Sequence, residues 1–533
     1  MVKGKISYLI KNSLQSFQRE KKLPKFGIPK ISIDPPEQKI HGDYSSNIAL
    51  EIARITKKDP LKIAELIKAK IQNFESKLFE KIETAKPGFI NFFLSKEYLQ
   101  EKVKEILEKK EQFGQLDFGK NKKVQVEFIS ANPTGPLTVG NARGGPFGDV
   151  LGNVLKKAGF KIEKAYYIND YGMQILTLGH SVLKDKKAKY KGDYIDYLHK
   201  IIKEKDPYKA GEKAAEIIVE EMIKKTTKRM GIKYDEWFSE KTLHKSSQID
   251  KVLEFLRKKG LIYEKDKAWW FRSSVYGDER DRVVVKADGW KTYLAGDIAY
   301  HRYKFEKKKF DKVINILGAD HCGDIASLRA GVEALGHKGK LDIVLLQFVT
   351  LYEKNKKLKM SKRKGIYVTV DELLDQVSPD VVRFFFLQRS ADTHLKFDLS
   401  LAKEQSEKNP VYYIQYAHAR ICSILRKLKA KDGKLKVKDQ NLKLLNHQSE
   451  LNLIKQLIRF PEIIEDTAKD YQIQRIPHYT RDLAGVFHQF YRDCKVITED
   501  EKLREARLAL ILATKIVLKN ALDVMGISAP EKM

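Results

Sequence analysis

Residues 127–141 combine a rigid turn with polar side chains that can meet a phosphate group. The segment reads Glu-Phe-Ile-Ser-Ala-Asn-Pro-Thr-Gly-Pro-Leu-Thr-Val-Gly-Asn. Its prolines restrict the backbone, and its glycines let a phosphate or a flat base approach that backbone closely. Free N–H groups at the start of the next helix attract an anion, and Thr138 and Asn141 can hydrogen-bond to it. An ordinary strand-to-helix loop is the alternative, because glycine-rich turns are common.

A second candidate segment is strongly basic. Residues 358–365 read Leu-Lys-Met-Ser-Lys-Arg-Lys-Gly. Lys359 and Lys362 could neutralise the charge that develops on a departing pyrophosphate, which is electrostatic rather than covalent catalysis. Taken alone, such a run is typical of a solvated face. Its significance comes from its pairing with the upstream turn.

Two acidic residues, Glu127 and Asp297, are candidates for binding a cationic substrate. Glu127 lies in an apolar segment predicted as a strand of a covered parallel sheet, where a carboxylate is costly unless a cation meets it. Asp297 precedes a helical stretch. The alternatives are an exposed strand end for Glu127 and a helix N-cap for Asp297. In a shared pocket the two would suit a guanidinium group, which is planar and always charged.

A helical segment near the end of the chain carries tyrosines and arginine together. Tyr412, Tyr413, Tyr416 and Arg420 follow one another within it. Aromatic rings provide stacking surfaces for unpaired bases, and basic side chains hold the phosphate backbone. Tyrosines at this spacing also fit the core of a helical bundle, so the segment alone leaves both interpretations open.

Composition excludes several classes of protein. The 533 residues include 102 Lys and Arg against 71 Asp and Glu, a net charge of +31, and 42% are hydrophobic. Such a chain can build cores and is not disordered as a whole. Its charge suits a polyanionic partner, although a generally solvated, lysine-rich surface is an equal alternative. No apolar run approaches the ~18 residues of a membrane span, and the start lacks a signal-peptide core, so we expect a cytoplasmic protein without membrane association.

The order of predicted elements indicates three domains. Residues 1–113 alternate helical and strand patterns, as in a small α+β module. Residues 120–398 begin with strand, loop, helix and strand, which predicts a Rossmann-type parallel α/β sheet that resumes with strands at residues 312–317 and 341–349. A long stretch at about 175–286 reads as a helical insertion in this domain. Residues 399–533 show only helical periodicity and predict an all-α bundle.

The two candidate loops together resemble the paired signatures of class I aminoacyl-tRNA synthetases. Further segments, spread in order along the whole chain, are similar to bacterial arginyl-tRNA synthetases. They are His41-Gly-Asp-Tyr44, Tyr166-Tyr-Ile-Asn-Asp-Tyr-Gly172, Tyr293-Leu-Ala-Gly-Asp297, Gly318-Ala-Asp-His321, Tyr416-Ala-His-Ala-Arg420 and Ser528-Ala-Pro-Glu-Lys-Met533. Several ordered matches are more specific than either loop alone.

The resemblance implies an arginine–tRNA ligase that uses ATP with Mg²⁺, without protein metal ligands or a tightly bound cofactor. Its partners would be L-arginine, ATP and the tRNA for arginine, with a monomer expected. The N-terminal module would be an additional tRNA-binding unit and the bundle the anticodon-binding domain. The implied residues are Pro133, Gly135, Thr138, Gly140, Asn141, Lys359 and Lys362 for ATP, Glu127, Ser130, Asn132, Tyr293, Asp297 and His321 for arginine, and Tyr416 and Arg420 for tRNA. Thr138, Asn141, Lys359 and Lys362 would be catalytic.

One position departs from the family pattern. Members usually carry histidines where this chain has Thr138 and Asn141. We expect activity to be retained, because Thr and Asn can still hydrogen-bond to a phosphate. The alternatives are a weakened paralogue that binds tRNA without charging it, a synthetase for another amino acid, or a nucleotidylyltransferase that acts on a small metabolite.

Overall fold

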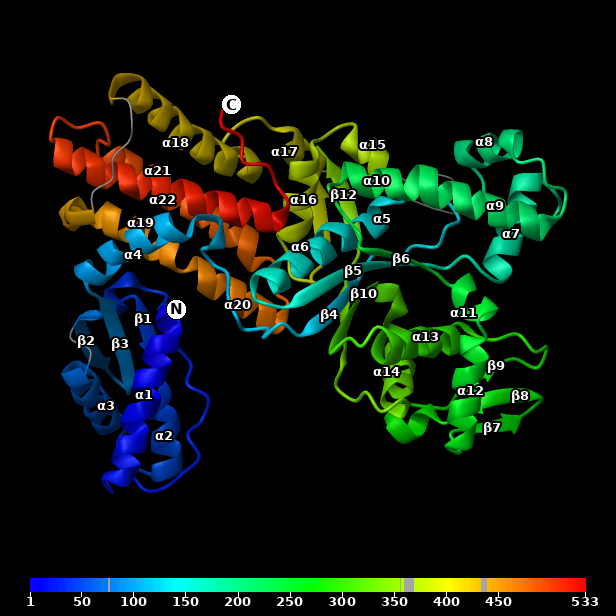
Figure 1. Ribbon diagram of the computed structural model, residues 1–533, viewed down its shortest axis with the longest axis horizontal. Coiled ribbons are helices and arrows are strands. Elements are labelled where there is room, and N and C mark those ends of the chain that lie inside the picture. The colour runs from blue at the N-terminus through cyan, green and yellow to red at the C-terminus, as the bar shows by residue number, and fades with distance from the viewer. Residues whose placement is uncertain (75–76, 355, 359–368, 433–438) are drawn as a thin grey trace.

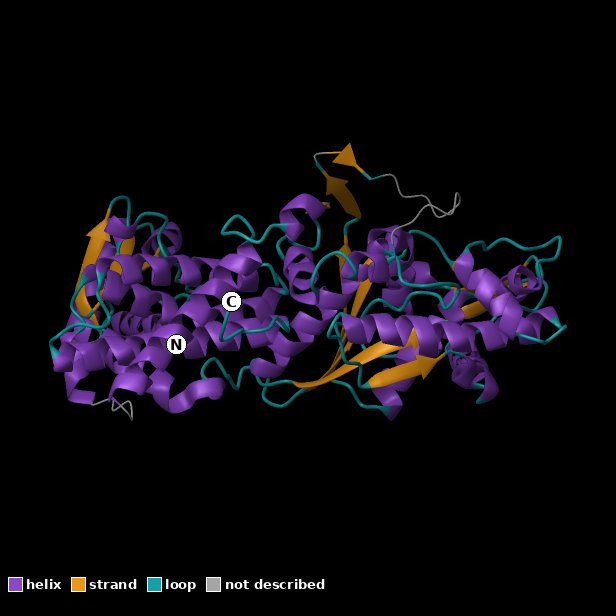
Figure 2. Ribbon diagram, turned by 90° about the horizontal axis from the view of Figure 1, so that it is seen from above, coloured by secondary structure: helices purple, strands orange, loops and turns teal. Residues whose placement is uncertain are grey.

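The computed structural model describes residues 1–74, 77–354, 356–358, 369–432 and 439–533. Figure 1 shows a small N-terminal module in blue, a central region around a sheet in cyan to yellow, and a helical region in orange and red. Helices fill most of the half of the molecule that carries both termini, as Figure 2 shows, with the strands of the N-terminal module at its outer end. The predicted combination of α+β module, parallel α/β domain and helical bundle is confirmed.

The N-terminal module packs helices on a small antiparallel sheet with strand order β1-β3-β2. Ile6, Ile10 and Leu14 recur every four residues along α1 and are fully buried, which is why this segment folds as an amphipathic helix. Proline begins α3, where its missing N–H costs nothing. The elements are α1 (Val2–Arg19), β1 (Tyr44–Ser46), α2 (Ile48–Thr56), α3 (Pro60–Phe74), β2 (Phe79–Ala85) and β3 (Phe89–Leu94).

The central region is built on a five-stranded parallel sheet with the order β11-β10-β4-β5-β6. The chain runs outward from β4 through β5 to β6 and then returns to the other side of β4 with β10 and β11. The connection after β4 contains α5 (Val139–Ala142) and α6 (Gly144–Lys157). The strands are β4 (Lys123–Glu127), β5 (Lys161–Ile168), β6 (Glu236–Ser239), β10 (Lys312–Gly318) and β11 (Leu341–Leu346).

The insertion predicted as helical at about 175–286 contains strands as well. Its first part is helical, but β6 within it pairs in parallel with β5 as the edge of the main sheet. A separate antiparallel sheet, β7-β8-β9, follows. These strands have four residues each, too few for an alternating pattern to stand out among helices. The elements are α7 (Met173–Leu183), α8 (Asp193–Ile201), α9 (Pro207–Ile217), a π-helical segment (Ile218–Ile223), α10 (Lys224–Arg229), α11 (Lys241–Lys245), α12 (Gln248–Lys258), β7 (Ile262–Lys265), β8 (Ala268–Phe271) and β9 (Arg282–Val285).

The strand predicted at residues 341–349 is two strands in different sheets. β11 ends at Leu346, and Gln347 N–H donates to the Ala391 carbonyl instead of continuing the ladder. The next strand, β12, joins β13 and β14 in a small sheet of its own. The elements from here to the bundle, with those between β9 and β11, are α13 (Tyr293–Arg302), a π-helical segment (Tyr303–Lys307), α14 (Ile325–Ala334), β12 (Val349–Glu353), β13 (Lys356–Lys357), α15 (Val370–Leu374), α16 (Pro379–Leu387), β14 (Leu395–Asp398) and α17 (Leu399–Lys403).

The C-terminal region is a helical bundle that also recruits α4 (Lys96–Lys109) from the N-terminal part of the chain. This helix contacts α19 and α22. It therefore packs with the bundle, although it falls within the module predicted at residues 1–113. Residue Gly526 ends α22 in the left-handed conformation that glycine adopts freely. The bundle helices are α18 (Pro410–Asp432), α19 (Gln448–Ile458), α20 (Phe460–Asp470), α21 (Arg475–Asp493) and α22 (Glu501–Met525).

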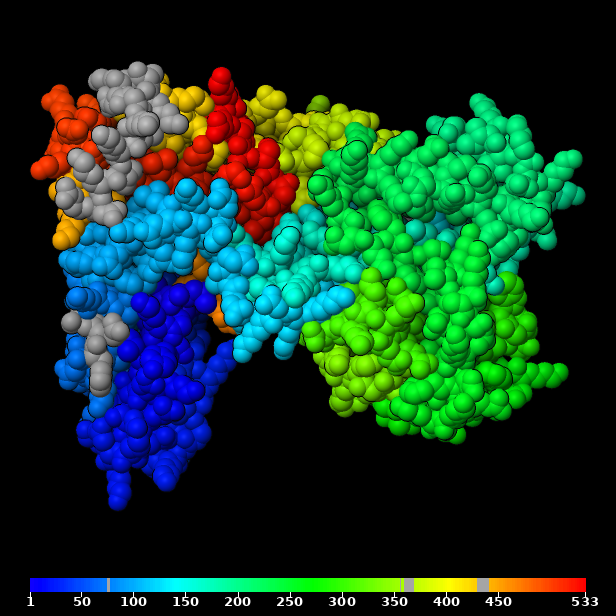
Figure 3. Space-filling model, viewed as in Figure 1, coloured from blue at the N-terminus to red at the C-terminus, as the bar shows by residue number. Residues whose placement is uncertain are grey.

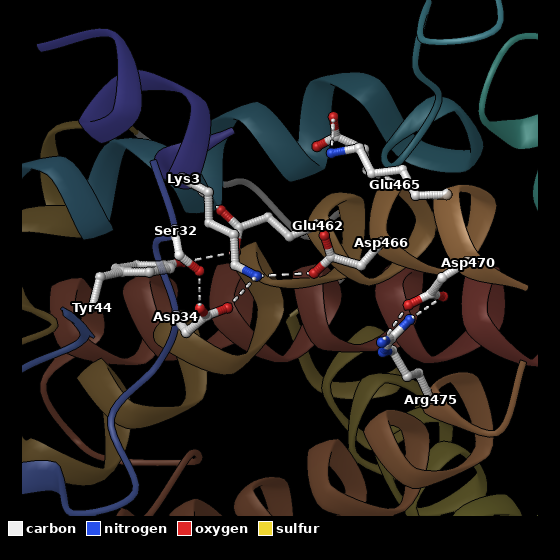
Figure 4. Close-up of polar contacts among 10 residues, drawn as sticks. Lys3, Ser32, Asp34, Tyr44, Glu462, Glu465, Asp466, Asp470 and Arg475 are labelled. Carbon is white, nitrogen blue, oxygen red and sulfur yellow. Dashed lines mark hydrogen bonds and ion pairs between the residues drawn. The ribbon is translucent and has the colours of Figure 1, made fainter. Parts of the chain in front are cut away.

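A buried carboxylate joins the N-terminal module to the bundle (Figure 4). Glu462 on α20 is 2% exposed. Its Oε1 accepts a hydrogen bond from the Lys3 backbone N–H at 2.9 Å, and its Oε2 accepts one from the Tyr44 hydroxyl at 2.9 Å. Lys3 Nζ also pairs with Asp466 at 2.9 Å and with Asp34 at 3.6 Å. These contacts hold the module against the bundle.

The outline of the molecule is concave. Figure 3 shows a hollow between the blue N-terminal module and the green part of the central region, under the cyan residues that connect the two sides. None of the helices in the described part of the chain combines the length and apolar character needed to span a bilayer.

Candidate active site

Several of the predicted pocket residues lie at the carboxyl ends of β4 and β10, where the strand order reverses. These two neighbours pair in parallel, with Glu127 opposite Asn315. Loops that leave such strands diverge to opposite sides and open a crevice, the common location of ligands in open α/β sheets. Glu127 ends β4, and His321 follows β10. The turn predicted to bind phosphate also begins here.

The backbone just after β4 is strained. Ile129 and Ser130 have φ angles of +65° and +41°, a region that a β-branched residue such as Ile129 rarely adopts. The Ser130 hydroxyl donates to Glu127 Oε1 at 3.2 Å and accepts from the Tyr167 N–H at 3.1 Å. These bonds fix Ser130 beside the Glu127 carboxylate. Strain of this kind persists where the surrounding contacts over-determine the backbone, and it clusters at functional sites.

Glu127 has a cationic partner within the protein. Its side chain is buried, and its Oε2 accepts a hydrogen bond from Lys304 Nζ at 2.5 Å. The lysine side chain is fully buried and also approaches Asn315 Oδ1 at 3.4 Å. The sequence indicated that a carboxylate at this position needs a cation beside it. Within the protein that cation is Lys304, which lies in the π-helical segment after α13.

Two further carboxylates face the same space from α13 and from the end of β6. Burial, together with the negative charges of Glu127 and Glu240, raises the pKa of Asp297 to about 7. Glu240 is 6% exposed, and its Oε2 is buried without a hydrogen-bond partner among the described residues. A buried carboxylate oxygen with unmet hydrogen-bonding capacity is costly, and a cation with several N–H donors could satisfy it.

The other residues predicted for arginine, Asn132, Tyr293 and His321, are exposed. Asn132 is exposed, and its Oδ1 accepts from Asn169 Nδ2 at 3.3 Å. Tyr293, at the start of α13, is 61% exposed, and His321 is also exposed, with Asp324 3.7 Å from its Nδ1. Asp170, a weaker candidate from the sequence, bonds to Ser239 and to the Lys241 N–H, so it has a structural role.

The predicted phosphate turn is closed by a bond between its two polar residues. Asn141 Oδ1 accepts from the Thr138 hydroxyl at 2.7 Å and from its N–H at 3.3 Å, which leaves the Asn141 amide N–H groups as the donors available to a ligand. Pro133 is buried, Gly135 is partly buried and Gly140 is exposed. The Tyr194 hydroxyl donates to the Thr134 carbonyl and holds the same loop.

The turn also meets the chain that returns from the basic run. Thr138 forms an isolated antiparallel bridge with Thr369, and the Val370 N–H donates to the Leu137 carbonyl at 2.9 Å. Lys359 and Lys362 themselves lie outside the described residues. The residue that directly follows residues 359–368 is thus anchored to the turn.

Sequence reasoning missed three residues that shape the site, Glu240, Lys304 and Arg143. The first two act through tertiary contacts that no local pattern reveals. The Arg143 guanidinium is buried directly after the turn and donates to the carbonyls of Gln347, Ser390 and Thr393 at 2.7–2.9 Å. The sequence offered one indication of its importance, because Arg143 lies two residues after Asn141, the last residue of the predicted turn. Across the described residues, no group of three or more His, Cys, Asp or Glu side chains is arranged to hold a metal ion.

The predicted RNA-binding residues lie on the face shared by α18 and α21. Tyr416 is 37% exposed and stacks on Tyr412 with a ring separation of 6.3 Å and an angle of 7°. The Arg420 guanidinium lies 5.0 Å from the Tyr416 ring and 4.8 Å from the Tyr491 ring. These cation–π contacts hold Arg420 beside an exposed aromatic face. The tyrosines are therefore partly exposed rather than simply core.

Known families match nearly the whole chain. Residues 4–94 match the family described as "Arginyl tRNA synthetase N terminal domain", residues 102–225 and 184–383 match "tRNA synthetases class I (R), catalytic domain", and residues 414–533 match "DALR anticodon binding domain". The arginine–tRNA ligase of Caldanaerobacter subterraneus is 43% identical, covering all of this chain and 99% of its own. That of Bacillus subtilis is 43% identical over 95% of each chain.

Solved structures agree at the level of the fold. A putative arginyl-tRNA synthetase from Campylobacter jejuni is 34% identical, with a TM-score of 0.74, and covers 83% of this chain and all of its own. The Thermus thermophilus arginyl-tRNA synthetase has a TM-score of 0.79 over the whole of both chains at 21% identity.

Proposed function

The chain belongs to the arginyl-tRNA synthetase family, and from this premise we propose how its residues charge tRNA with arginine. The enzyme is an aminoacyl-tRNA ligase that uses ATP, arginine and tRNA. The observation that carries our proposal is the carboxylate cluster of Glu127, Asp297 and Glu240, of which Glu127 and Glu240 are buried and Asp297 is partly buried. Among the described residues, Lys304 is the one lysine that pairs with this cluster.

Asp297 and Glu240 receive the guanidinium group in this proposal. Glu127 already has Lys304 as partner, whereas Glu240 keeps an unpaired buried oxygen. A guanidinium offers five N–H donors in a rigid plane and can at once meet Asp297 and Glu240 Oε2, which has no hydrogen-bond partner among the described residues. Tyr293 lies at the pocket's opening, where its ring can cover the bound side chain.

In this proposal the α-amino and α-carboxylate groups of arginine, its head group, bind closer to the end of β4 than its guanidinium group does. Glu127, Ser130 and Asn132 follow one another around the end of β4, and the Glu127–Ser130 bond fixes their spacing. In our proposal Asn132 and Ser130 hydrogen-bond the head group while Glu127 attracts its ammonium group. His321, which stands on the loop after the neighbouring strand β10, completes this side of the pocket.

ATP binds at the turn that follows β4. Pro133, Gly135 and Gly140 shape the backbone around it, and Thr138 and Asn141 meet its phosphates. Lys359 and Lys362, outside the described residues, would neutralise the pyrophosphate as it leaves. The contacts of Thr369 and Val370 with the turn support this, because they bring the chain that follows both lysines back to the phosphate site. Mg²⁺ is part of the ATP substrate here, bound through phosphate oxygens and water, as it prefers.

Two steps complete the reaction. The arginine carboxylate attacks the α-phosphate of ATP, which forms arginyl-adenylate and releases pyrophosphate. A hydroxyl of the terminal ribose of tRNA then attacks the arginyl carbonyl and releases AMP. The protein aligns the reactants and matches the developing charge, and no side chain forms a covalent intermediate.

The helical bundle recognises the anticodon in this proposal. Tyr416 offers a stacking face to an unpaired base, and Arg420 can contact the adjoining phosphate. We assign residues 1–113 to an additional tRNA-binding module, 120–398 to the catalytic domain with its insertion at about 175–286, and 399–533 to anticodon binding. We further propose a monomer that works in the cytoplasm, where tRNA is charged for protein synthesis.

Arginine-dependent exchange of pyrophosphate into ATP tests this function. The assay is run with and without tRNA, and is repeated with lysine and with citrulline in place of arginine. We expect exchange with arginine alone among the three, because citrulline lacks the charge that the carboxylates require. Exchange that ignores arginine would contradict the pocket. Bound tRNA without exchange under any condition would favour the weakened paralogue.

A further inference from the structure

A cluster of three rings, one of them exposed, lies beside the carboxylate pocket and has no role in the function described so far. It consists of Tyr171, His244 and Trp290. Tyr171 stacks on His244 with a ring separation of 3.7 Å and an angle of 21°. The Trp290 ring lies 6.4 Å from Tyr171, and 43% of Trp290 is exposed. An exposed indole next to a ligand pocket is typical of a binding surface.

Contacts connect this cluster directly to the pocket. His244 Nε2 lies 3.6 Å from Glu240 Oε1, and Glu240 contributes the unpaired oxygen of the pocket. Trp290 precedes Tyr293, the exposed residue at the pocket's opening, by three positions. Tyr171 follows β5 and His244 lies on α11, directly after β6. The cluster therefore borders the pocket on the β6 side, whereas the ATP turn follows β4.

The turn that carries Trp290 is rigid. The Lys286 N–H donates to the Trp290 carbonyl at 2.8 Å, and the Trp290 N–H donates to Asp288 Oδ1 at 3.1 Å. Val285 and Lys291 form an antiparallel bridge around it, and Gly289 supplies the positive φ of +82° that the turn requires. Trp290 is thus presented on an ordered turn between β9 and α13, the two elements that Figure 1 shows next to α11.

We propose that this cluster binds the unpaired 3′-terminal nucleotide of tRNA by stacking its base on Trp290. The inference rests on the proposed function, because the terminal ribose must reach the arginyl carbonyl held in the pocket. Arginine is recognised by the carboxylates, and ATP by the turn after β4. An aromatic face at the remaining border suits the one reactant that brings an unpaired base. Tyr171 contacts the indole of Trp290 and stacks on His244, which in turn contacts Glu240, so the three rings connect Trp290 to the pocket.

The test compares Trp290→Ala with Trp290→Phe and with Trp270→Ala. Trp270 is a partly exposed tryptophan on β8 whose Nε1 donates to the Lys265 carbonyl, and it serves as the matched control. Loss of one base–aromatic stack should lower kcat/KM for tRNA by about 5- to 100-fold in Trp290→Ala. The KM for arginine should stay within about twofold. Trp290→Phe should recover most of the activity, and Trp270→Ala should match the wild type.

A second readout reports stacking itself. The terminal adenine of tRNA is replaced by 2-aminopurine, whose fluorescence is quenched when it stacks on an aromatic ring. We expect quenching on binding to the wild type and to Trp270→Ala, and markedly less with Trp290→Ala. Equal quenching in both Trp290→Ala and the wild type, or an unchanged kcat/KM for tRNA, would overturn the inference. A wild type that does not charge tRNA with arginine would instead refute the proposed function.

Discussion

Asp297 and Glu127 lie in the same candidate pocket but differ in their ionic partners. Within the described part of the chain Glu127 pairs with the buried Lys304, and Asp297 has no such ion pair. We expect Asp297→Asn to raise the KM for arginine by about 10- to 100-fold, because a charge-assisted hydrogen bond contributes about 1.5–3 kcal/mol. The KM for ATP should change by less than about threefold. Steady-state exchange kinetics measure both, and an equal rise in the two constants would contradict the assignment.

The raised pKa of Asp297 predicts how arginine binding depends on pH. Burial and the charges of Glu127 and Glu240 bring this pKa to about 7, so the free enzyme holds a neutral carboxyl group at lower pH. Guanidinium binding needs the carboxylate. The KM for arginine should therefore fall as pH rises through about 7 and level off about one unit above it, with a change of at most about tenfold per pH unit below.

Asp297→Asn provides the control for this profile. The variant removes the titrating group and keeps its shape, so its KM for arginine should vary much less between about pH 6 and pH 8.5. Other groups near the pocket, including His244, remain in the variant. A profile that persists unchanged in Asp297→Asn would assign the titration to one of those groups instead.

At the scale of elements, the sequence could indicate only those parts of the candidate site that are contiguous along the chain. β4, the turn after it and α13 carry Glu127, Thr138 and Asp297 within recognisable segments. Glu240 escaped prediction because it follows a strand of four residues inside a stretch that reads as helical, and its role arises only when β6 pairs with β5. Lys304 escaped for a similar reason, since a lysine in a charged helical segment normally indicates a solvated face.

The contact between α20 and the N-terminal module yields a prediction about stability. Glu462→Ala leaves the Tyr44 hydroxyl and the Lys3 N–H buried without their acceptor. Each unsatisfied buried donor costs about 1–3 kcal/mol, so we expect a loss of about 2–4 kcal/mol in the free energy of unfolding. Urea unfolding followed by circular dichroism measures it.

The same helix offers a matched control. Glu465 pairs with Lys469 one turn further along α20, with 2.9 Å between Oε1 and Nζ, and it is drawn with Glu462 in Figure 4. Glu465→Ala should cost about 0.5 kcal/mol, because an i,i+4 pair whose lysine is exposed contributes little. If both substitutions destabilised the protein equally, the loss would reflect the helix rather than the buried carboxylate.

At the scale of the whole molecule, the positive net charge and the concave outline both suit the binding of tRNA, a large polyanion. The net charge is +31, while the proposed arginine pocket is a cluster of negative side chains, two of which are buried. Binding of a polyanion by lysine and arginine releases condensed counterions, so affinity falls steeply as salt rises. Buried charges are screened much less. A change of ionic strength should therefore affect the affinity for tRNA much more than the KM for arginine.

We expect the dissociation constant for tRNA to rise at least about tenfold between roughly 50 mM and 200 mM salt, since even a few phosphate contacts produce such a slope. Over the same range the KM for arginine should change by less than about threefold, because, of its two proposed partners, Glu240 is buried and Asp297 is partly buried. Filter binding and exchange kinetics at matched salt concentrations give the two values. Parallel salt dependence of both constants would mean that exposed charges recognise arginine, and it would contradict the proposed pocket.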